Sequence, residues 1–74
     1  MDITTAAGDL YPNHIIAGTD GQRWVVVGNE RIRRGVVRLT LSDLDTGFVV
    51  QREMGAGFQV TVTGARSYFR EMPA

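Results

Sequence analysis

The sequence predicts a single small all-β domain. Nine glycines divide the 74 residues into short segments, and several segments alternate apolar and polar side chains with the period of two that is typical of strands. The same segments are rich in valine and other residues that favour strands. A hydrophobic share of 43% with 22% charged residues is an ordinary globular composition. We therefore expect residues 1–74 to form one domain, near the lower size limit for an independent core.

Five segments of about six residues are the expected strands. They cover residues 14–18, 23–28, 36–42, 48–53 and 58–63. The second segment is apolar on both faces, so we expect it at the centre of the sheet. The apolar residues of 36–42 are expected to share one face, and Phe58, Val60 and Val62 are expected to point inward from the last strand.

The connections are marked by short polar residues and glycine. Asp20-Gly21 is a hairpin signal. Residues 43–47 combine short side chains that can bond their own backbone with a glycine able to adopt positive φ. The polar and basic segment 28–35 is expected to be a loop. The tail, residues 65–72, is expected to form a short helical turn that ends before Pro73.

Five short antiparallel strands must curl to bury one face in so small a chain. A small five-stranded SH3-like barrel is the economical solution. We expect its core to span residues 9–63, with the short C-terminal helical or turn segment at 65–72.

The order of these motifs is shared with one known domain. In the stretches "DLYPNHIIAGTDGQRWVVV" and "GVVRLTLSDLDTGFVVQREMGAGFQV", an apolar strand, an Asp-Gly turn, a strand with an initial aromatic, a basic alternating strand and a Thr-Gly turn follow one another. This order resembles the N-terminal domain of bacterial translation elongation factor P over roughly residues 9 to 62. The matching residues are Asp9, Leu10, Pro12, Ile15, Ile16, Asp20, Gly21, Trp24, Val26, Val37, Arg38, Leu39, Leu41, Leu44, Thr46, Gly47, Val50, Ala56 and Gly57.

The resemblance implies a KOW-like, SH3-like barrel. In that family, a lysine or arginine in the loop between the second and third strands reaches the acceptor end of a tRNA on the ribosome. The matching loop here is shorter, and its tip candidates are Arg31, Arg33 and Arg34. The chain has no lysine and no counterpart of the family's two downstream oligonucleotide-binding-fold domains. We therefore expect a lone module of this shape, reused for another purpose, and not a working elongation factor.

The strongest candidate for a site is the segment from Glu30 to Leu41. It holds four of the eight basic residues, which are Arg31, Arg33, Arg34 and Arg38. Arginine suits phosphate because its planar fork makes two parallel hydrogen bonds. The segment could therefore bind an RNA or DNA backbone, although a net charge of zero argues against strong long-range attraction. The alternatives are a contact with a protein partner and a solvated segment paired with Glu30 and Asp43.

Aromatic side chains provide a second set of candidates. Tyr11, His14, Trp24 and Phe48 could supply base stacking if they are exposed, although a lone tryptophan in a small β-domain is more typical of a core. Tyr68 and Phe69 are expected to cap an open end of the barrel. If they are exposed, they mark a surface for a partner or for a homo-oligomer.

No catalytic, cofactor-binding or metal-binding residues are expected. The chain has no cysteine and one histidine, so neither a catalytic pair nor a zinc site can be assembled from these residues. Asp43 and Asp45 are explained by their turn. We therefore expect a non-enzyme.

The location and partners follow from the same residues. No apolar run approaches the roughly 20 residues needed to cross a bilayer, and the N-terminus lacks a secretory signal, so we expect a cytoplasmic protein without membrane association. The leading hypothesis is an RNA- or nucleic-acid-associated module. The alternative is a protein-interaction or assembly module, such as a phage or mobile-element protein that is a virion component or modulates a host complex. The edge strand 48–53 and the terminal aromatics would then form the contact surface.

Overall fold

The structure is a computed structural model that describes residues 2–18 and 21–65. These residues form an all-β fold with one short 3-10 helix, so the all-β part of the prediction is confirmed. The elements are β1 (Ile3–Ala6), η1 (Ala7–Asp9), β2 (His14–Ala17), β3 (Arg23–Arg33), β4 (Val36–Asp43), β5 (Val49–Gly55) and β6 (Gln59–Ala65). Within this part of the chain, no helix has the length and hydropathy to span a membrane.

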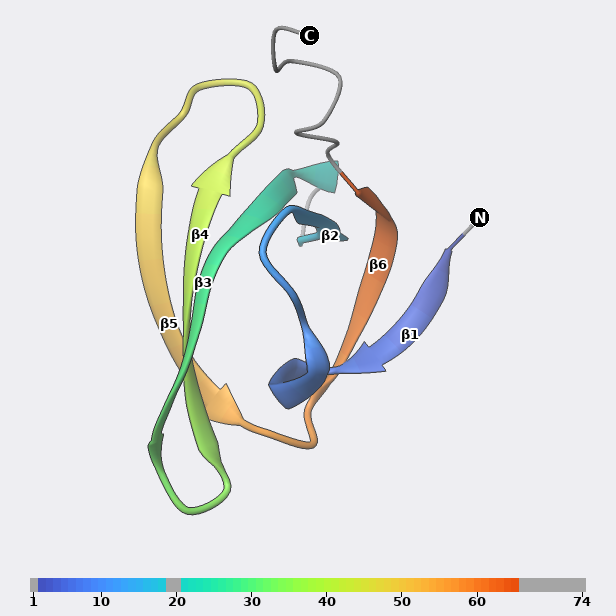
Figure 1. Cartoon of the computed structure of the whole chain (residues 1–74). Coiled ribbons are helices and arrows are strands. Elements are labelled where there is room, and N and C mark those ends of the chain that lie inside the picture. The colour runs from blue at the N-terminus through green and yellow to red at the C-terminus, as the bar shows by residue number, and fades with distance from the viewer. Residues whose placement is uncertain (1, 19–20, 66–74) are drawn as a thin grey trace, which may run out of the picture.

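The strands form one antiparallel sheet in the order β1-β6-β2-β3-β4-β5. The sheet bends strongly, so that β1 and β6 lie across an interior from β3, β4 and β5 (Figure 1). β1 and β5 are its two edges and do not pair with each other, so the sheet stays open. The helix η1 lies at the end of this interior, between the two halves of the sheet.

The core lies on the inner face of the bent sheet. Its buried members are Ala7, Leu10, Ile16, Val26, Val37, Leu39, Leu41, Val60 and Val62. In β4 burial alternates residue by residue, as expected for a strand with one face on the core. This confirms the predicted shared face of the apolar residues in this strand. Trp24 is partly buried and packs against the cluster, so its side chain lies at the edge of the core.

Backbone hydrogen bonds hold η1 against the end of the sheet. The Ala7 N–H donates to the carbonyl of Phe58, and the Gly8 N–H donates to the carbonyl of Ala56, both at 2.8 Å. A side chain at Gly8 would place its Cβ 3.1 Å from Ala56 Cβ, so glycine permits this close approach. These contacts join the region after β1 to the segment that follows β5.

The expected loop at residues 28–35 is wrong. β3 continues to Arg33, and β4 begins at Val36, so only Arg34 and Gly35 connect the strands, with Gly35 at a φ of 74°. The pairing is interrupted by irregularities at residues 26–28 and 31–33. The polar composition misled the prediction because this hairpin extends beyond the core, where a strand needs no apolar face (Figure 1).

The expected count of five strands is also wrong, because β1 pairs with β6 as a sixth strand. Its sequence, ITTA, is short, and its pairing joins residues about 60 positions apart, which local patterns do not reveal. The expectation that Phe58 points inward is wrong as well. Phe58 precedes β6 and is 61% exposed, whereas Val60 and Val62 are buried as predicted.

The turn at residues 43–47 is confirmed. The carboxylate Oδ1 of Asp43 accepts hydrogen bonds from the backbone N–H groups of Asp45, at 2.8 Å, and Thr46, at 3.1 Å. Gly47 follows with a φ of 79°. Ala65 belongs to β6 and not to a helix. The rest of the expected helical tail, with Tyr68 and Phe69, and Asp20 of the Asp-Gly turn lie outside the described residues.

Candidate functional site

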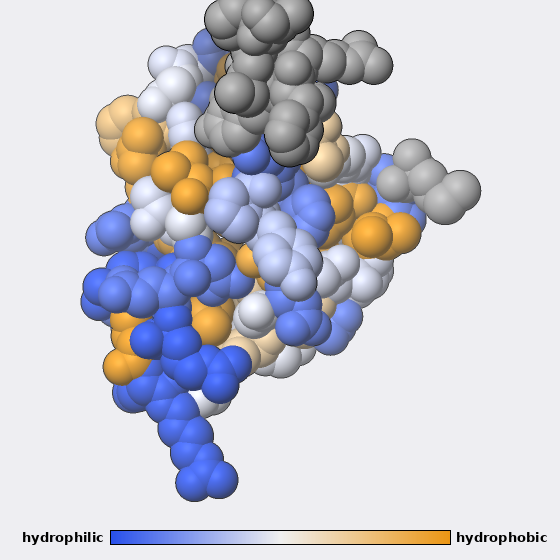
Figure 2. Space-filling view, viewed as in Figure 1, coloured by the Kyte–Doolittle hydropathy of each residue, from blue (hydrophilic) through white to orange (hydrophobic). Residues whose placement is uncertain are grey.

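The hairpin of β3 and β4 concentrates positive charge in a chain that is neutral overall. Between Glu30 and Arg38 it carries four arginines and one glutamate, a local net charge of +3. The hairpin projects from the bent sheet (Figure 1). Figure 2 shows hydrophilic side chains gathered over this end of the molecule. The candidate arginines therefore lie on one projecting element and not on a flexible loop.

Arg38 is balanced by two carboxylates. Its guanidinium lies 3.5 Å from the carboxylate of Glu30 and 3.3 Å from that of Glu53. The register explains this arrangement, because Arg38 lies directly opposite Glu30 on β3 and Glu53 on β5, and directly opposed residues point to the same side of a sheet. Arg38 is therefore the least available of the four predicted arginines for an external anion.

Arg31, Arg33 and Arg34 are exposed and make no ion pair with any residue in the described ranges. Arg31 lies opposite the buried Val37, so its side chain leaves from the inner face of the sheet. Arg33 lies opposite Val36 and leaves from the other face, while Arg34 occupies the turn. The structure brings the three arginines together at one end but spreads them over two faces and the tip.

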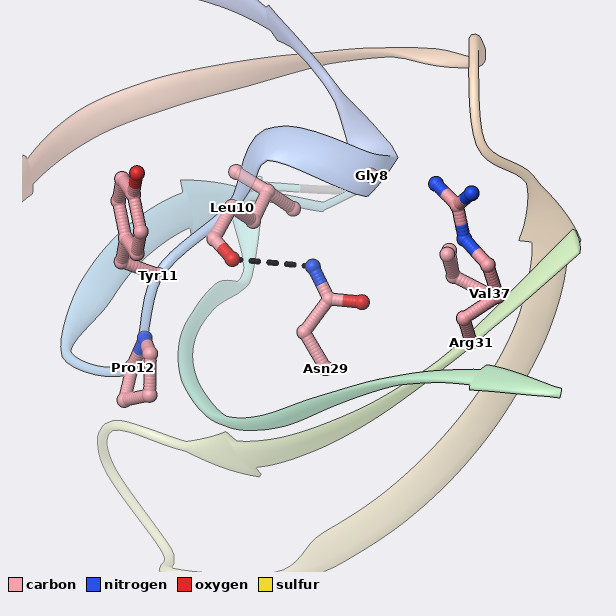
Figure 3. A pocket seen from close by; sticks show the side chains of 7 residues that line it. All are labelled: Gly8, Leu10, Tyr11, Pro12, Asn29, Arg31 and Val37. Atoms are coloured by element: carbon pink, nitrogen blue, oxygen red, sulfur yellow. Dashed lines mark hydrogen bonds between the residues drawn. The ribbon is translucent and has the colours of Figure 1, made fainter. Parts of the chain in front are cut away.

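A hollow of about 280 Å³ lies between this hairpin and the segment that follows η1 (Figure 3). Its lining residues are Gly8, Leu10, Tyr11, Pro12, Asn29, Arg31 and Val37. The apolar Leu10 and Val37 are 3% and 2% exposed. Tyr11 and Pro12 lie at one end of the hollow and Arg31 at the other. The hollow thus combines a flat aromatic ring, an apolar floor and a cation.

Asn29 stands in the middle of the hollow and joins its two walls. Its Nδ2 donates to the carbonyl of Ala7 at 3.0 Å and to the carbonyl of Leu10 at 2.9 Å. Since both amide hydrogens face carbonyl oxygens, the orientation of the carboxamide is fixed. Its Oδ1 points toward the side on which Arg31 lies (Figure 3). The hollow therefore contains a hydrogen-bond acceptor held in one position.

The segment that carries Tyr11 is also held in place. The backbone N–H of Tyr11 donates to His14 Nδ1 at 3.0 Å, and the two rings meet edge to face with centroids 5.8 Å apart. Asn13 takes a φ of 77° and donates its N–H to the carbonyl of Val26 at 2.7 Å. Tyr11 itself is 70% exposed. His14 thus supports the exposed ring, and Tyr11 is the aromatic among the predicted candidates that lines the hollow.

Asn29 was not identified by sequence reasoning. Residues 28–35 were predicted to be a loop, and the position of Asn29 opposite the buried Leu39 follows only from the pairing of β3 with β4. Phe48 is 67% exposed but lies beside the turn between β4 and β5, away from the hairpin tip. Among the residues that the structure describes, no cluster of three histidine, aspartate or glutamate side chains is arranged to hold a metal ion.

No protein-family model matches the chain, and a search of curated proteins finds no significant match. The resemblance to elongation factor P therefore rests on the order of its motifs alone.

Proposed function

We propose that this protein is a small non-enzymatic module that binds nucleic acid, in the first place single-stranded RNA, through the β3–β4 hairpin. The observation that carries the proposal is the contrast between the arginines. Arg38 is neutralised by Glu30 and Glu53, whereas Arg31, Arg33 and Arg34 project with no ion pair to the described part of the chain. Their charge is therefore available to an external anion.

The spacing of these arginines suits a short length of phosphate backbone. A strand rises about 3.3 Å per residue, so Arg31 to Arg34 extend over roughly 10 Å along the hairpin. Each guanidinium can bind a phosphate with two parallel hydrogen bonds. Because the net charge of the chain is zero, we expect no strong long-range steering. The contacts between arginine and phosphate should still make the affinity fall as the salt concentration rises.

The finer description of the fold belongs to the same proposal. We propose that the bent sheet is an SH3-like, KOW-like barrel left open between β1 and β5. The motif order and the bend of the sheet support this assignment. The proposed site corresponds to the hairpin by which the resembling family reaches a tRNA. On the same basis, we propose a cytoplasmic protein that associates with RNA or with the ribosome.

A titration with two matched variants tests the proposed function. The purified chain is titrated against a labelled single-stranded RNA and a DNA duplex at low and moderate salt. The variant Arg33→Ala/Arg34→Ala is expected to lose most of its affinity. The control Arg23→Ala/Arg52→Ala removes two exposed arginines that lie away from the projecting end of the hairpin, since Arg23 begins β3 and Arg52 lies on β5, and it changes the net charge equally. Equal losses in the two variants, or no binding by the wild type at low salt, would refute the proposal.

A protein-interaction module is the second candidate, and the edge strand β5 favours it. Among the described residues, β5 pairs on one side only, and Phe48, directly before it, and Val49, its first residue, are 67% and 55% exposed. An edge strand with apolar neighbours can pair with another chain. Sedimentation over a wide concentration range tests the simplest partner, a second copy. Association that Val49→Lys abolishes would support this candidate, and a monomer at every concentration would exclude self-pairing.

A further inference from the structure

The hollow beside the hairpin has features that phosphate binding alone does not require. An arginine on a projecting strand is sufficient to contact a backbone phosphate. Here Arg31 also shares a hollow with an exposed tyrosine ring and a fixed amide oxygen. We propose that this hollow is a site for one unpaired nucleobase that carries an exocyclic amino group, with the adjoining phosphate on Arg31. The inference rests on the proposed function and names the part of the nucleic acid that is recognised.

The size of the hollow suits a single flat ring. Sites for drug-sized ligands measure about 300–1,000 Å³, and this hollow, at about 280 Å³, lies just below that range. Its floor is formed by the apolar Leu10 and Val37, which are almost completely buried. A base that leaves its stack could lie on this floor. Its contact with the apolar side chains would then offset the stacking that it gave up. A hollow of this volume suits one unpaired base.

Tyr11 provides the stacking surface. Tyr11 is 70% exposed, yet its backbone N–H donates to His14 Nδ1 and the rings of the two residues meet edge to face. The side chain is therefore presented at the mouth of the hollow by a constrained turn. Stacking of a base on an aromatic ring contributes about 1–3 kcal/mol by alanine substitution, so loss of the ring should weaken binding about tenfold.

Asn29 provides the base preference. Both of its Nδ2 hydrogens are used within the fold, so the side chain can offer a ligand only its Oδ1, which is an acceptor. An acceptor in a fixed position favours the N4 amino group of cytosine and opposes the carbonyl oxygen that uracil carries at the same position. Cytosine and uracil have nearly the same ring, so this pair isolates the effect of the amide oxygen.

Arg31 provides the charge for the adjoining phosphate. It lies at the end of the hollow opposite Tyr11 (Figure 3), on the same projecting hairpin as Arg33 and Arg34. A strand bound along the hairpin would therefore pass this end of the hollow. Asp9 is exposed on η1, next to the lining residue Gly8. Because its charge opposes phosphate, Asp9→Asn should raise the affinity about twofold.

The test compares cytosine with uracil in two kinds of ligand. RNA strands of about eight nucleotides, all cytosine or all uracil, are titrated into the full chain, and CMP and UMP are titrated separately by NMR. We expect the cytosine strand to bind about five- to tenfold more tightly than the uracil strand. CMP is expected to shift the signals of Tyr11, Asn29 and Arg31, and UMP to shift them less.

Variants of exposed aromatic residues complete the test. Tyr11→Ala should weaken the cytosine strand about tenfold, whereas Tyr11→Phe, which keeps the ring, should stay within about twofold. Phe48→Ala is the matched control, because Phe48 is equally exposed and lies outside the hollow. Thermal unfolding of each variant verifies that it is folded.

The outcomes separate the inference from the proposed function. One outcome would be that the two strands bind equally, that Tyr11→Ala leaves the affinity unchanged and that Arg33→Ala/Arg34→Ala lowers it. This outcome would refute the base site and leave the proposed function of the hairpin intact. Binding of CMP without binding of either strand would support the base site and refute the proposed function of the hairpin. An acidic, aromatic peptide that shifts the hollow's signals where neither CMP nor the strands do would overturn the inference in favour of a protein ligand.

Discussion

Asn29 is the residue on which the geometry of the hollow depends, and its replacement makes the sharpest stability prediction. Asn29→Ala removes two hydrogen bonds, of 3.0 and 2.9 Å, to the carbonyls of Ala7 and Leu10. These two residues are 0% and 3% exposed, so water can replace the lost donors only in part. With about 0.5–1.5 kcal/mol for each bond and the added cost of poorly solvated carbonyls, we expect a loss of about 2–3 kcal/mol.

This loss should be easy to measure in so small a domain. A change of 1 kcal/mol shifts the midpoint of thermal unfolding by about 4–8 °C in domains of this size, so Asn29→Ala should lower the midpoint by roughly 10–20 °C. Urea unfolding followed by the fluorescence of Trp24, the single tryptophan, gives the free energy directly. Asn29→Asp, which keeps the shape but points oxygen at both carbonyls, should destabilise at least as strongly.

Gln51 is the matched control for the amide. It makes one exposed hydrogen bond of 3.3 Å, to Thr40 Oγ1, so Gln51→Ala should change the free energy of unfolding by less than about 0.5 kcal/mol. If Asn29→Ala were no more destabilising than Gln51→Ala, the claim that Asn29 joins β3 to the segment around η1 would be refuted. The fixed acceptor on which the base preference rests would then be lost as well.

Three further substitutions test the fold by the same urea assay. Leu39→Ala truncates a side chain that is 0% exposed and should cost about 2–5 kcal/mol, whereas Phe58→Ala should cost less than about 1 kcal/mol; similar losses would contradict the assigned core. Gly47→Ala places a side chain at a φ of 79° and should lower the free energy of unfolding by about 1 kcal/mol or more. A loss no larger than that of Gly57→Ala, where φ is not positive, would contradict this prediction. Arg38→Ala removes two exposed ion pairs and should cost less than about 1 kcal/mol, with the difference shrinking in high salt; a larger, salt-independent loss would contradict this account.

The parts of the fold that follow from local chemistry could be predicted from the sequence. The alternation in β4 reports directly which residues face the core, and Val37, Leu39 and Leu41 are buried as expected. The turn at residues 43–47 was predictable because the side chain of Asp43 bonds to backbone groups two and three residues further along. Both features depend on neighbours in the sequence.

The missed features depend on contacts between distant residues. β1 is recognisable only through its pairing with β6. The outer half of β3 is a strand because its backbone forms hydrogen bonds with β4, and this pairing does not depend on the pattern of its side chains. The hollow has the same origin. Tyr11 and Arg31 are twenty residues apart, and they share one site because the side chain of Asn29 bonds to the carbonyls around η1.

The salt dependence of RNA binding tests the central claim most directly. If Arg31, Arg33 and Arg34 each neutralise one phosphate of a single strand, the logarithm of the affinity should fall with the logarithm of salt concentration with a slope of about −2. Arg33→Ala/Arg34→Ala should reduce the slope to about −0.7, whereas Arg23→Ala/Arg52→Ala should leave it near the wild-type value. A slope that the hairpin variant leaves unchanged would contradict the account, because the phosphates would then be bound elsewhere on the protein.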